Sequence, residues 1–269
     1  MNMTQSLQTA MVLVTAGASG IGRVIAESFL KCGATVHLVD ISQTAIDECL
    51  ADNAEFSQSQ LSASVCDVSD QSQVSQLFDN FKQTHHRLNV LVNNAGIAGP
   101  TAVVEHIAND DWQKTLDVNL TGAFTMTRLA VPLLKQDGGG SIINISSNAG
   151  LFGLPLRSPY VASKWALIGL TKTWAMELGP FNIRVNAICP GSVAGPRIDR
   201  VIERDAAERG MTPKEIRTVY QRQSSMRVFV KAQDVANMAV YLASESGASI
   251  SGQALSIDGH TESLSNWLD

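Results

Sequence analysis

The chain has 269 residues, of which 45% are hydrophobic and 17% charged, and its formal net charge is −5 at pH 7. This acidic balance argues against an extended nucleic-acid interface, and no apolar run approaches the roughly 20 residues of a membrane span. The N-terminus lacks the basic and apolar regions of a secretory signal, and the four scattered cysteines indicate neither a metal site nor a disulfide framework. We therefore expect a cytoplasmic protein with no nucleic-acid, membrane or metal partner.

Short apolar segments rich in β-branched residues alternate with longer helical patterns. Strands are predicted over residues 11–15, 35–39, 61–65, 90–92, 141–146, 184–188 and 254–257. Helices are predicted over residues 20–31, 44–52, 71–84, 110–135, 160–178 and 233–244. This alternation predicts an α/β fold, a doubly wound (Rossmann) parallel sheet of seven strands with helices on both faces. No linker divides the chain, so we expect a single domain over residues 1–269. The polar stretch 196–228 should form one or two short helices outside the sheet.

Three glycines, Gly17, Gly20 and Gly22, follow the first predicted strand and open the first predicted helix. In a doubly wound sheet this turn binds a phosphate, because the helix N-terminus offers free N–H groups and a favourable dipole. Glycines allow a pyrophosphate to approach the backbone closely. The spacing G-x-x-G-x-G differs from the commonest nicotinamide fingerprint, and a tight turn without a ligand is the alternative.

Asp40 ends the second predicted strand, about 20 residues beyond the glycine turn. A carboxylate there can accept hydrogen bonds from the adenosine ribose hydroxyls and would repel a 2′-phosphate. A role beside a helix N-cap is the alternative for Asp40 alone. No Arg or Lys stands at Ser19 or Ile41 to hold a 2′-phosphate. The turn and the carboxylate together predict a bound dinucleotide, NAD in preference to NADP.

Further motifs follow the glycine turn in a fixed order. They are "CDV" with Asp67 and Val68, "NNAG" from Asn93 to Gly96, "DVNL" with Asn119, "NISSNAG" with Ser147, "YVASK" with Tyr160 and Lys164, and "CPG" with Pro190 and Gly191. Over nearly the whole chain, this ordered set resembles the short-chain dehydrogenase/reductase family of NAD(P)-dependent oxidoreductases. The resemblance implies cofactor contacts from Gly17, Ser19, Gly20, Ile21, Gly22, Asp40, Asp67, Val68, Asn94, Ala95, Gly96, Tyr160, Lys164, Pro190, Gly191 and Val193.

The predicted catalytic residues are Asn119, Ser147, Tyr160 and Lys164. Tyr160 and Lys164 stand four residues apart on a predicted helix, so the ammonium can lower the phenol pKa and make the tyrosine an acid/base; a surface pair is the alternative. The family spacing of 13 residues before the tyrosine selects Ser147 as the group that stabilises the substrate oxygen. Ser146 should point to the opposite face of its strand and serve packing. The resemblance also implies that Lys164 binds the nicotinamide ribose and that Asn119 opens a helix bulge and relays protons; an ordinary polar helix face is the alternative for Asn119.

Two residues depart from the family pattern. Ala16 stands where the family usually has glycine, and we expect Gly17 beside it to take the permissive backbone angle. Gly195 stands where the family commonly has a threonine that binds the nicotinamide carboxamide, which puts that one contact in doubt.

The stretch 196–228 contains most of the arginines of the chain: Arg197, Arg200, Arg204, Arg209, Arg217, Arg222 and Arg227. In this fold such a segment commonly closes over the substrate, so we expect it to form a lid. Arg197, nearest the "CPG" turn, is the first candidate to clamp an anionic substrate group, and Arg157 is the second. A solvated helix with internal ion pairs is the alternative. A polar lid favours a polyol, a sugar or a hydroxy acid as the small-molecule substrate.

The sequence therefore predicts an NAD-dependent dehydrogenase that interconverts a secondary alcohol and a ketone. The alternatives are an NAD(H)-sensing protein without catalysis and a lyase or epimerase that uses NAD transiently. The family resemblance further implies a homotetramer or homodimer, assembled through the helices predicted at 110–135 and 160–178.

Overall fold

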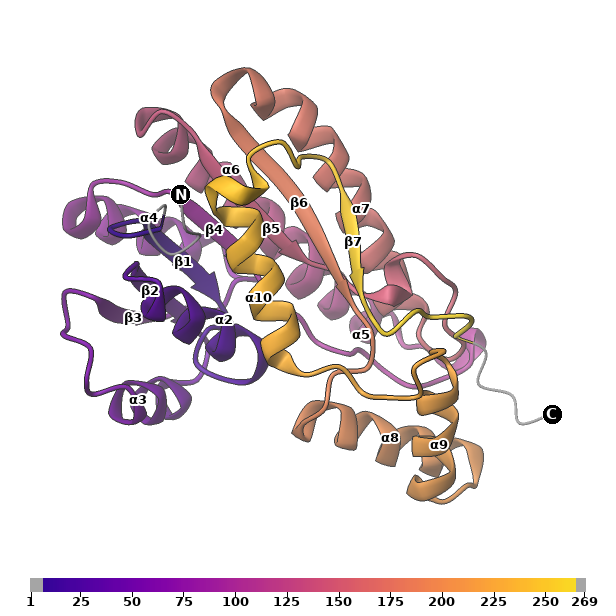
Figure 1. Ribbon diagram of the computed structural model, residues 1–269. Helices are drawn as coiled ribbons and strands as arrows, with labels where there is room; N and C mark the ends of the chain where they lie inside the picture. The colour runs from indigo at the N-terminus through magenta and orange to yellow at the C-terminus, as the bar shows by residue number, and fades with distance from the viewer. Residues whose placement is uncertain (1–6, 265–269) are drawn as a thin grey trace.

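All seven predicted strands are present in the computed structural model, which describes residues 7–264 (Figure 1). They form one parallel sheet in the order β3-β2-β1-β4-β5-β6-β7. Their bounds are β1 Met11–Thr15, β2 Thr35–Asp40, β3 Leu61–Val65, β4 Val90–Asn93, β5 Gly140–Ile145, β6 Ile183–Pro190 and β7 Ala254–Ile257. The strand order reverses direction at β1, which confirms the doubly wound fold.

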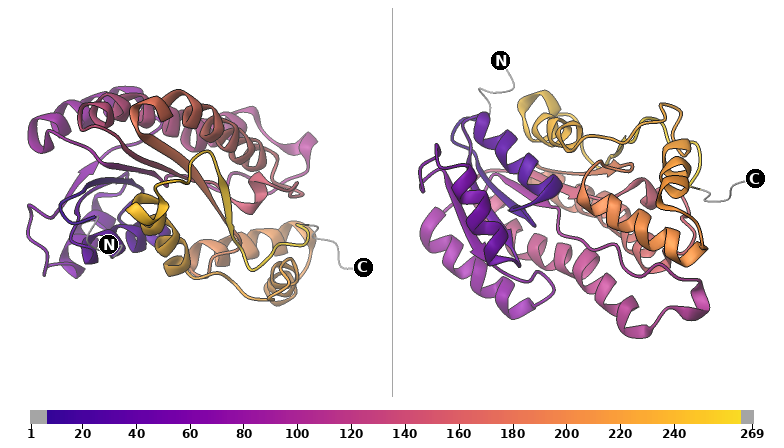
Figure 2. Two further views of the ribbon diagram at one scale, coloured as in Figure 1. Left: turned by 45° about the horizontal axis from the view of Figure 1, so that its top comes forward. Right: turned by 90° about the horizontal axis from the view of Figure 1, so that it is seen from below.

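Helices cover both faces of the sheet (Figure 2). They are α2 Gly20–Lys31, α3 Gln43–Asp52, α4 Gln71–His85, α5 Asn109–Leu116, α6 Gly122–Gln136, α7 Ser158–Leu178, α8 Pro196–Arg209, α9 Pro213–Arg222 and α10 Ala232–Ala243. Val12 and Val14 of β1 pack with Ile25 of α2 on one face, while Leu13 packs with Phe78 of α4 on the other. Alternate side chains of the central strand thus enter two separate cores, as a strand buried on both faces requires. None of the helices within residues 7–264 is both long enough and apolar enough to cross a membrane.

The single helix predicted over residues 110–135 is interrupted in the structure. Helices α5 and α6 are joined by a π-helical turn, Asp117–Thr121, which contains Asn119. Asn119 is buried, and its amide group bonds the backbone of Ile97 in place of solvent. Because a mid-helix asparagine competes for backbone hydrogen bonds, the irregular turn and this contact belong together.

Residues 196–228 form α8 and α9 outside the sheet, as the sequence predicts (Figure 1). Thr212 begins α9 with a capping box to Glu215, and proline opens both helices. A small apolar cluster that includes Ile202, Ile216 and Tyr220 holds the two helices together. The pair is therefore a separately packed layer beside the ends of β6 and β7.

Candidate active site

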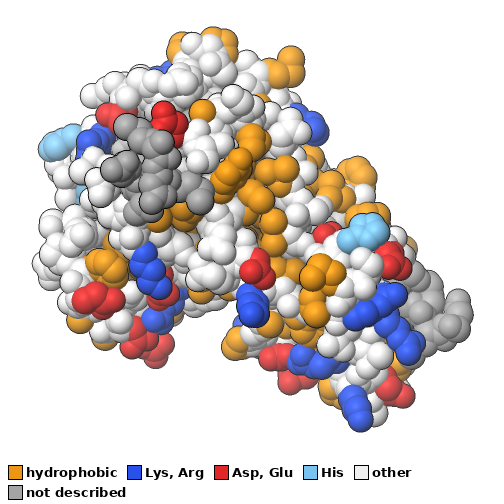
Figure 3. All heavy atoms as spheres, viewed as in Figure 1, with side chains coloured by type: hydrophobic (Ala, Val, Ile, Leu, Met, Phe, Trp, Pro, Cys, Tyr) orange, Lys and Arg blue, Asp and Glu red, His pale blue; other side chains and the backbone are white. Residues whose placement is uncertain are grey.

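The carboxyl ends of parallel strands share one edge of the sheet, and the predicted site residues follow those ends. The outline of the molecule is notched at this edge, between the lobe that carries α3 and the lobe that carries α8 and α9 (Figure 3). The glycine turn after β1 lies on one side of the notch, and the start of α8 lies on the other (Figure 1).

The turn after β1 places its left-handed residue one position earlier than expected. Ala16 itself has φ of 47°, whereas Gly17 has no positive φ, so the expectation that Gly17 takes the permissive angle is wrong. Gly17 is required for space instead: a Cβ there would lie 2.8 Å from the Val14 carbonyl oxygen and 3.0 Å from Leu38 Cδ2. The chain must reverse directly after Thr15, and this puts the strained angle on the alanine.

The other two glycines of the turn serve different purposes. A Cβ on Gly22 would lie 2.1 Å from the Ala16 carbonyl oxygen and 2.5 Å from Asn94 Nδ2, so this position lets α2 pack against the turn. Gly20 has φ of 54° and open space around its missing Cβ. Ser19, the N-cap of α2, makes no side-chain capping bond, and no acidic residue stands in the first turn. The N-terminus of α2, with Ile21 in its first turn, thus keeps N–H groups without a side-chain cap, which suits a pyrophosphate.

Asp40 joins the glycine turn to the start of α3. Its carboxylate accepts hydrogen bonds from the backbone N–H of Ala18 at 3.2 Å and of Ser42 at 3.1 Å. Ser42, not Asp40, is the N-cap of α3, since its hydroxyl accepts from Ala45. The carboxylate therefore stands between the phosphate turn and the β2–α3 connection, where an adenosine ribose would lie.

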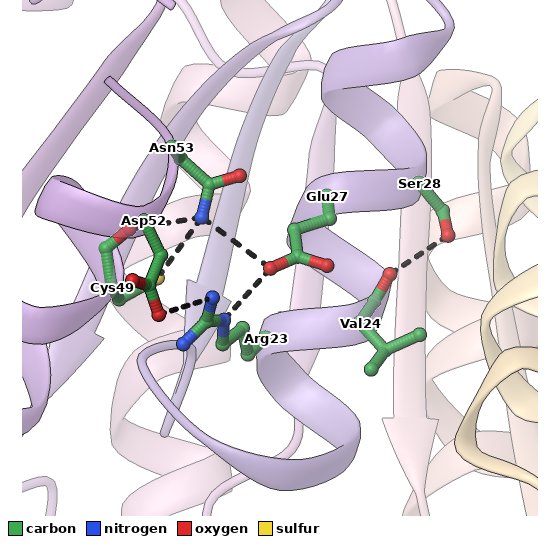
Figure 4. A network of polar contacts seen from close by, with 7 residues as sticks. All are labelled: Arg23, Val24, Glu27, Ser28, Cys49, Asp52 and Asn53. Atoms are coloured by element: carbon green, nitrogen blue, oxygen red, sulfur yellow. Dashed lines mark hydrogen bonds and ion pairs between the residues drawn. The ribbon is translucent and has the colours of Figure 1, made fainter. Parts of the chain in front are cut away.

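The basic side chain in the first turn of α2 is engaged elsewhere. Arg23 Nε donates to Glu27 at 2.7 Å, and its Nη2 donates to Asp52 near the end of α3 at 3.0 Å (Figure 4). Asn53 completes this network through Glu27 and the Cys49 carbonyl. The network ties α2 to α3, and it leaves the Arg23 guanidinium committed to two carboxylates and not to a cofactor phosphate.

The "NNAG" segment supports the turn from β4. Thr15 Oγ1 accepts hydrogen bonds from the backbone N–H of Asn94 and of Ala95, both at 2.9 Å. Asn93 donates to Asn144 of β5 at 2.8 Å, inside the sheet. Gly96 leaves no room for a side chain, since a Cβ there would lie 3.2 Å from Asn119 Oδ1.

The remaining predicted cofactor contacts lie at neighbouring strand ends. The Asp67 carboxylate accepts from both N–H and hydroxyl of Ser69, and Val68 is buried. After Pro190, which ends β6, a Cβ on Gly191 would lie 2.9 Å from Asp258 Cβ. Val193 pairs with Val230 in a parallel bridge beyond the sheet. Gly195, with φ of 140°, precedes α8 as its N-cap.

Tyr160 and Lys164 occupy the first turns of α7. Lys164 is 3% exposed, and its ammonium donates to the Ile145 carbonyl oxygen at 2.8 Å. Burial alone would raise the pKa of the Tyr160 phenol, but the charges of Lys164 and Arg197, a hydrogen bond with Ser147 and the charge of Arg157 together lower that pKa below its ordinary value. Burial also lowers the pKa of Lys164, against the opposing influence of the Tyr160 phenolate. The two groups are therefore electrostatically coupled.

The two adjacent serines after β5 face different partners. The Ser146 hydroxyl donates to the Lys164 carbonyl oxygen at 3.0 Å and is 3% exposed. The Ser147 hydroxyl accepts from the Ala149 N–H at 3.1 Å and reaches the Tyr160 phenol. Only Ser147 thus shares the space in front of Tyr160.

The two arginine candidates differ in burial. Arg197, at the start of α8, is exposed, yet its charge acts on Tyr160. Arg157 is 3% exposed at the N-cap of α7. Tyr220, which no sequence motif marks, lies beside this arginine, and its hydroxyl donates to Asp205 at 3.0 Å. No local motif marks that contact, because α8 and α9 reach α7 only through the tertiary fold.

Comparisons with known proteins agree with this geometry. A family model described as enoyl-(acyl carrier protein) reductase matches residues 15–260. The 3-oxoacyl-[acyl-carrier-protein] reductase FabG of Thermotoga maritima is 36% identical over 253 residues, which are 94% of this chain and 98% of that protein. The D-beta-hydroxybutyrate dehydrogenase of Rhizobium meliloti is 34% identical and covers 93% of this chain and 98% of its own.

A solved structure shows the same architecture. The crystal structure of NAD+-bound xylitol dehydrogenase superposes with a TM-score of 0.89 at 29% identity, over 93% of this chain and 98% of that one. Proteins of this kind are oxidoreductases that act on hydroxyl and ketone groups with NAD(P). With the ordered motifs, the sheet and these relatives in agreement, the chain belongs to the short-chain dehydrogenase/reductase family.

Proposed function

We propose that the protein is an NAD-dependent dehydrogenase that interconverts a secondary alcohol and a ketone on a polyol, a sugar or a hydroxy acid. The observation that carries this proposal is the buried Lys164 beside Tyr160, whose phenol pKa is lowered in spite of burial. A lowered phenol pKa brings proton exchange with an alcohol closer to neutral pH. The names of the relatives, which include hydroxybutyrate and xylitol dehydrogenases, support a small hydroxylated substrate.

The glycine turn and Asp40 support NAD as the cofactor. The uncapped start of α2 suits the pyrophosphate, Asp40 suits two ribose hydroxyls, and the Arg23 guanidinium is held by carboxylates. When bound, the nicotinamide would supply the acceptor for the hydride that leaves the alcohol carbon. Lys164 would hold the nicotinamide ribose, and Pro190, Gly191 and Val193 would border the ring.

Four side chains would share the proton transfer and the stabilisation of the substrate oxygen. Tyr160 takes the hydroxyl proton of the alcohol, and Lys164 stabilises the phenolate that does so. Ser147 donates a hydrogen bond to the substrate oxygen as its charge develops. Gly96 lies between the Asn119 amide oxygen and the Lys164 ammonium, since a Cβ there would be 3.2 Å from one and 3.5 Å from the other. This placement supports Asn119 as the group that relays protons between Lys164 and solvent.

Two larger features follow from the family resemblance. We propose that residues 196–228 form a lid over the substrate within a single domain. Exposed apolar side chains lie along the outer helices, namely Trp112 of α5, Phe124 of α6, and Trp165 and Met176 of α7. We propose that these helices form the interface of a homotetramer, which sedimentation equilibrium of the purified protein should detect as four chains per particle.

A direct assay tests the proposed reaction. Purified protein with NAD and a panel of polyols, sugars and hydroxy acids should raise the absorbance of NADH, and Tyr160→Phe should lower kcat by about 10³-fold or more, since a positioned acid/base contributes 10²–10⁴-fold. NAD binding by Tyr160→Phe, measured by calorimetry, is the control for folding. Tight NAD binding by the unaltered protein without turnover of any substrate would instead favour an NAD(H) sensor.

A further inference from the structure

Within residues 7–264, the buried guanidinium of Arg157 near Tyr160 has no ion-pair partner. Arg157 is 3% exposed, and within residues 7–264 neither of its terminal nitrogens, Nη1 and Nη2, makes a hydrogen bond of normal geometry, although the guanidinium lies close enough to the Tyr220 hydroxyl to lower its pKa. In the same part of the chain, no carboxylate lies within ion-pair distance of it. A buried cation in this state is unfavourable unless a ligand or water satisfies its donors. These two donors therefore lack the compensation that an anionic group could supply on entering the site.

The surroundings do not explain Arg157 as a structural anchor. The neighbouring carboxylate, Asp205, uses Oδ2 to accept from the Tyr220 hydroxyl, and its Oδ1 is itself buried without a partner. A structural arginine would pair directly with this carboxylate, in the fork geometry that guanidinium favours. Here the Tyr220 hydroxyl donates to one oxygen of Asp205 and lies close enough to the Arg157 guanidinium for a contact that lowers the Tyr220 pKa, so Arg157 meets the tyrosine and forms no ion pair with the carboxylate.

The position of Arg157 directs it toward the reacting group. Arg157 is the N-cap of α7 and precedes Tyr160 by three residues. Its charge acts on the phenols of both Tyr160 and Tyr220. The charged side chains with the largest influence on the Tyr160 phenol are cations, namely Lys164, Arg197 and Arg157. The space in front of Tyr160 is thus electropositive and suits an anionic substrate.

We infer that Arg157 binds the carboxylate of the substrate through its two terminal nitrogens while the substrate hydroxyl meets Tyr160. This assignment rests on the proposed function and narrows it to short hydroxy acids and their keto acids. Three residues separate Arg157 from Tyr160, about 4.5 Å at the rise of a helix, so a substrate that meets both has its carboxylate only a few bonds from the reacting carbon. Sugars and uncharged polyols lack the group that Arg157 would bind.

Matched pairs of substrates test the assignment. We would compare (R)- and (S)-3-hydroxybutyrate with the enantiomers of 1,3-butanediol, which keep the reacting carbon and lack the carboxylate. The unaltered enzyme should favour the acid at least 100-fold in kcat/KM. Arg157→Gln should lower this preference at least 30-fold, mainly through KM, and Arg157→Lys should restore part of it because the charge is kept. Arg204→Gln, on the exposed face of α8, is the matched control and should keep the full preference.

A second measurement does not depend on turnover. Calorimetry should show 3-hydroxybutyrate binding to the protein–NADH complex, in which no oxidation can occur, and the binding should weaken at least 30-fold in Arg157→Gln. Turnover of diols without any preference for the acid would overturn the role of Arg157 and leave the proposed reaction intact. Binding of the acid that depends on Arg157, without turnover of any alcohol, would support the role of Arg157 and overturn the proposed reaction. If both arginine variants lose thermal stability and weaken acid and diol equally, Arg157 is structural and the inference is wrong.

Discussion

The side-chain Nδ2 of Asn94 donates a hydrogen bond to the carbonyl oxygen of Ala16 at 3.1 Å, and so holds the peptide of a residue with φ of 47°. The β4 end thereby supports a left-handed alanine in the cofactor turn. Left-handed backbone costs an alanine roughly 1–2 kcal/mol, whereas glycine adopts it freely.

Ala16→Gly should therefore stabilise the protein. Relief of the left-handed angle outweighs the extra chain entropy of glycine, so the free energy of unfolding should rise by about 0.5–1 kcal/mol. Urea denaturation measures this change, and NAD affinity should stay within a few-fold. Ala207→Gly, at an exposed helical position in α8, is the matched control and should destabilise by about 1 kcal/mol. A loss of stability in Ala16→Gly would show that the turn is not strained.

Asp40 should decide which dinucleotide binds. Asp40→Asn keeps an oxygen that can accept from Ala18 and removes the charge that opposes a 2′-phosphate. Loss of charge-assisted hydrogen bonds to the ribose should weaken NAD binding by about tenfold or more, and NADP should bind more tightly than it does to the unaltered protein. Fluorescence titration with NADH and NADPH measures both affinities. Asp47→Asn, on the exposed face of α3, should change neither. Equal weakening of both cofactors would contradict a role in discrimination.

Substitution of the two adjacent serines should show which hydroxyl supports catalysis and which supports packing. Ser147→Ala removes the hydroxyl in front of Tyr160 and should lower kcat by about 10²–10³-fold. Ser146→Ala removes the hydrogen bond to the Lys164 carbonyl oxygen, which should cost about 1 kcal/mol of stability and leave kcat within about threefold. Steady-state kinetics and urea denaturation of both variants give the comparison. Equal losses of kcat would mean that the strand end, and not one hydroxyl, supports the reaction.

The pH dependence of the oxidation rate should report the ionisation of the Tyr160 phenol. Since Lys164 and then Arg197 are the largest influences that lower its pKa, removal of either charge should move the rising limb of kcat/KM to higher pH. Lys164→Met should cause the larger shift and Arg197→Gln a smaller one in the same direction. Profiles between pH 6 and 10.5 with the best substrate measure both shifts, and Arg204→Gln should leave the limb in place. A limb that stays fixed in both variants would exclude Tyr160 as the titrating base.

Much of the fold could be predicted, because alternating apolar segments determine which elements form and parallel strands bring their carboxyl ends together. The cofactor turn and the Tyr160–Lys164 pair are local in sequence, so their spacing alone suggested that they lie close. The left-handed backbone angle of Ala16 could not be predicted from the sequence, because it depends on how the chain leaves β1 and on support from Asn94. The surroundings of Arg157 depend on Tyr220 of α9, more than 60 residues along the chain, lying beside it. The sequence neighbourhood of Arg157 looks like that of an ordinary surface arginine.

His37 should make stability depend on pH. It is 6% exposed on β2, and its ring nitrogens lie 2.8 and 3.0 Å from the hydroxyls of Ser62 and Ser64. Burial, with a smaller effect of His85, lowers the pKa of His37 to about 4, from about 6.5 in the unfolded chain. The unfolded state therefore binds the extra proton first as pH falls, and the free energy of unfolding should decrease between pH 6.5 and 4, by about 3 kcal/mol in total.

Urea denaturation at pH 7.5, 5.5 and 4.5 tests this slope. His37→Gln should flatten it, because glutamine can bond the same hydroxyls without titrating, while His106→Gln, at an exposed position, should leave it unchanged. The slope would have another origin if His37→Gln lost as much stability over this range as the unaltered protein. In that case the carboxylates that are hydrogen-bonded in the fold would be the next groups to examine. Asp70 leads that set: hydrogen bonds, first from the Ser72 hydroxyl and then from the backbone and side chain of Gln73, lower its pKa to about 2.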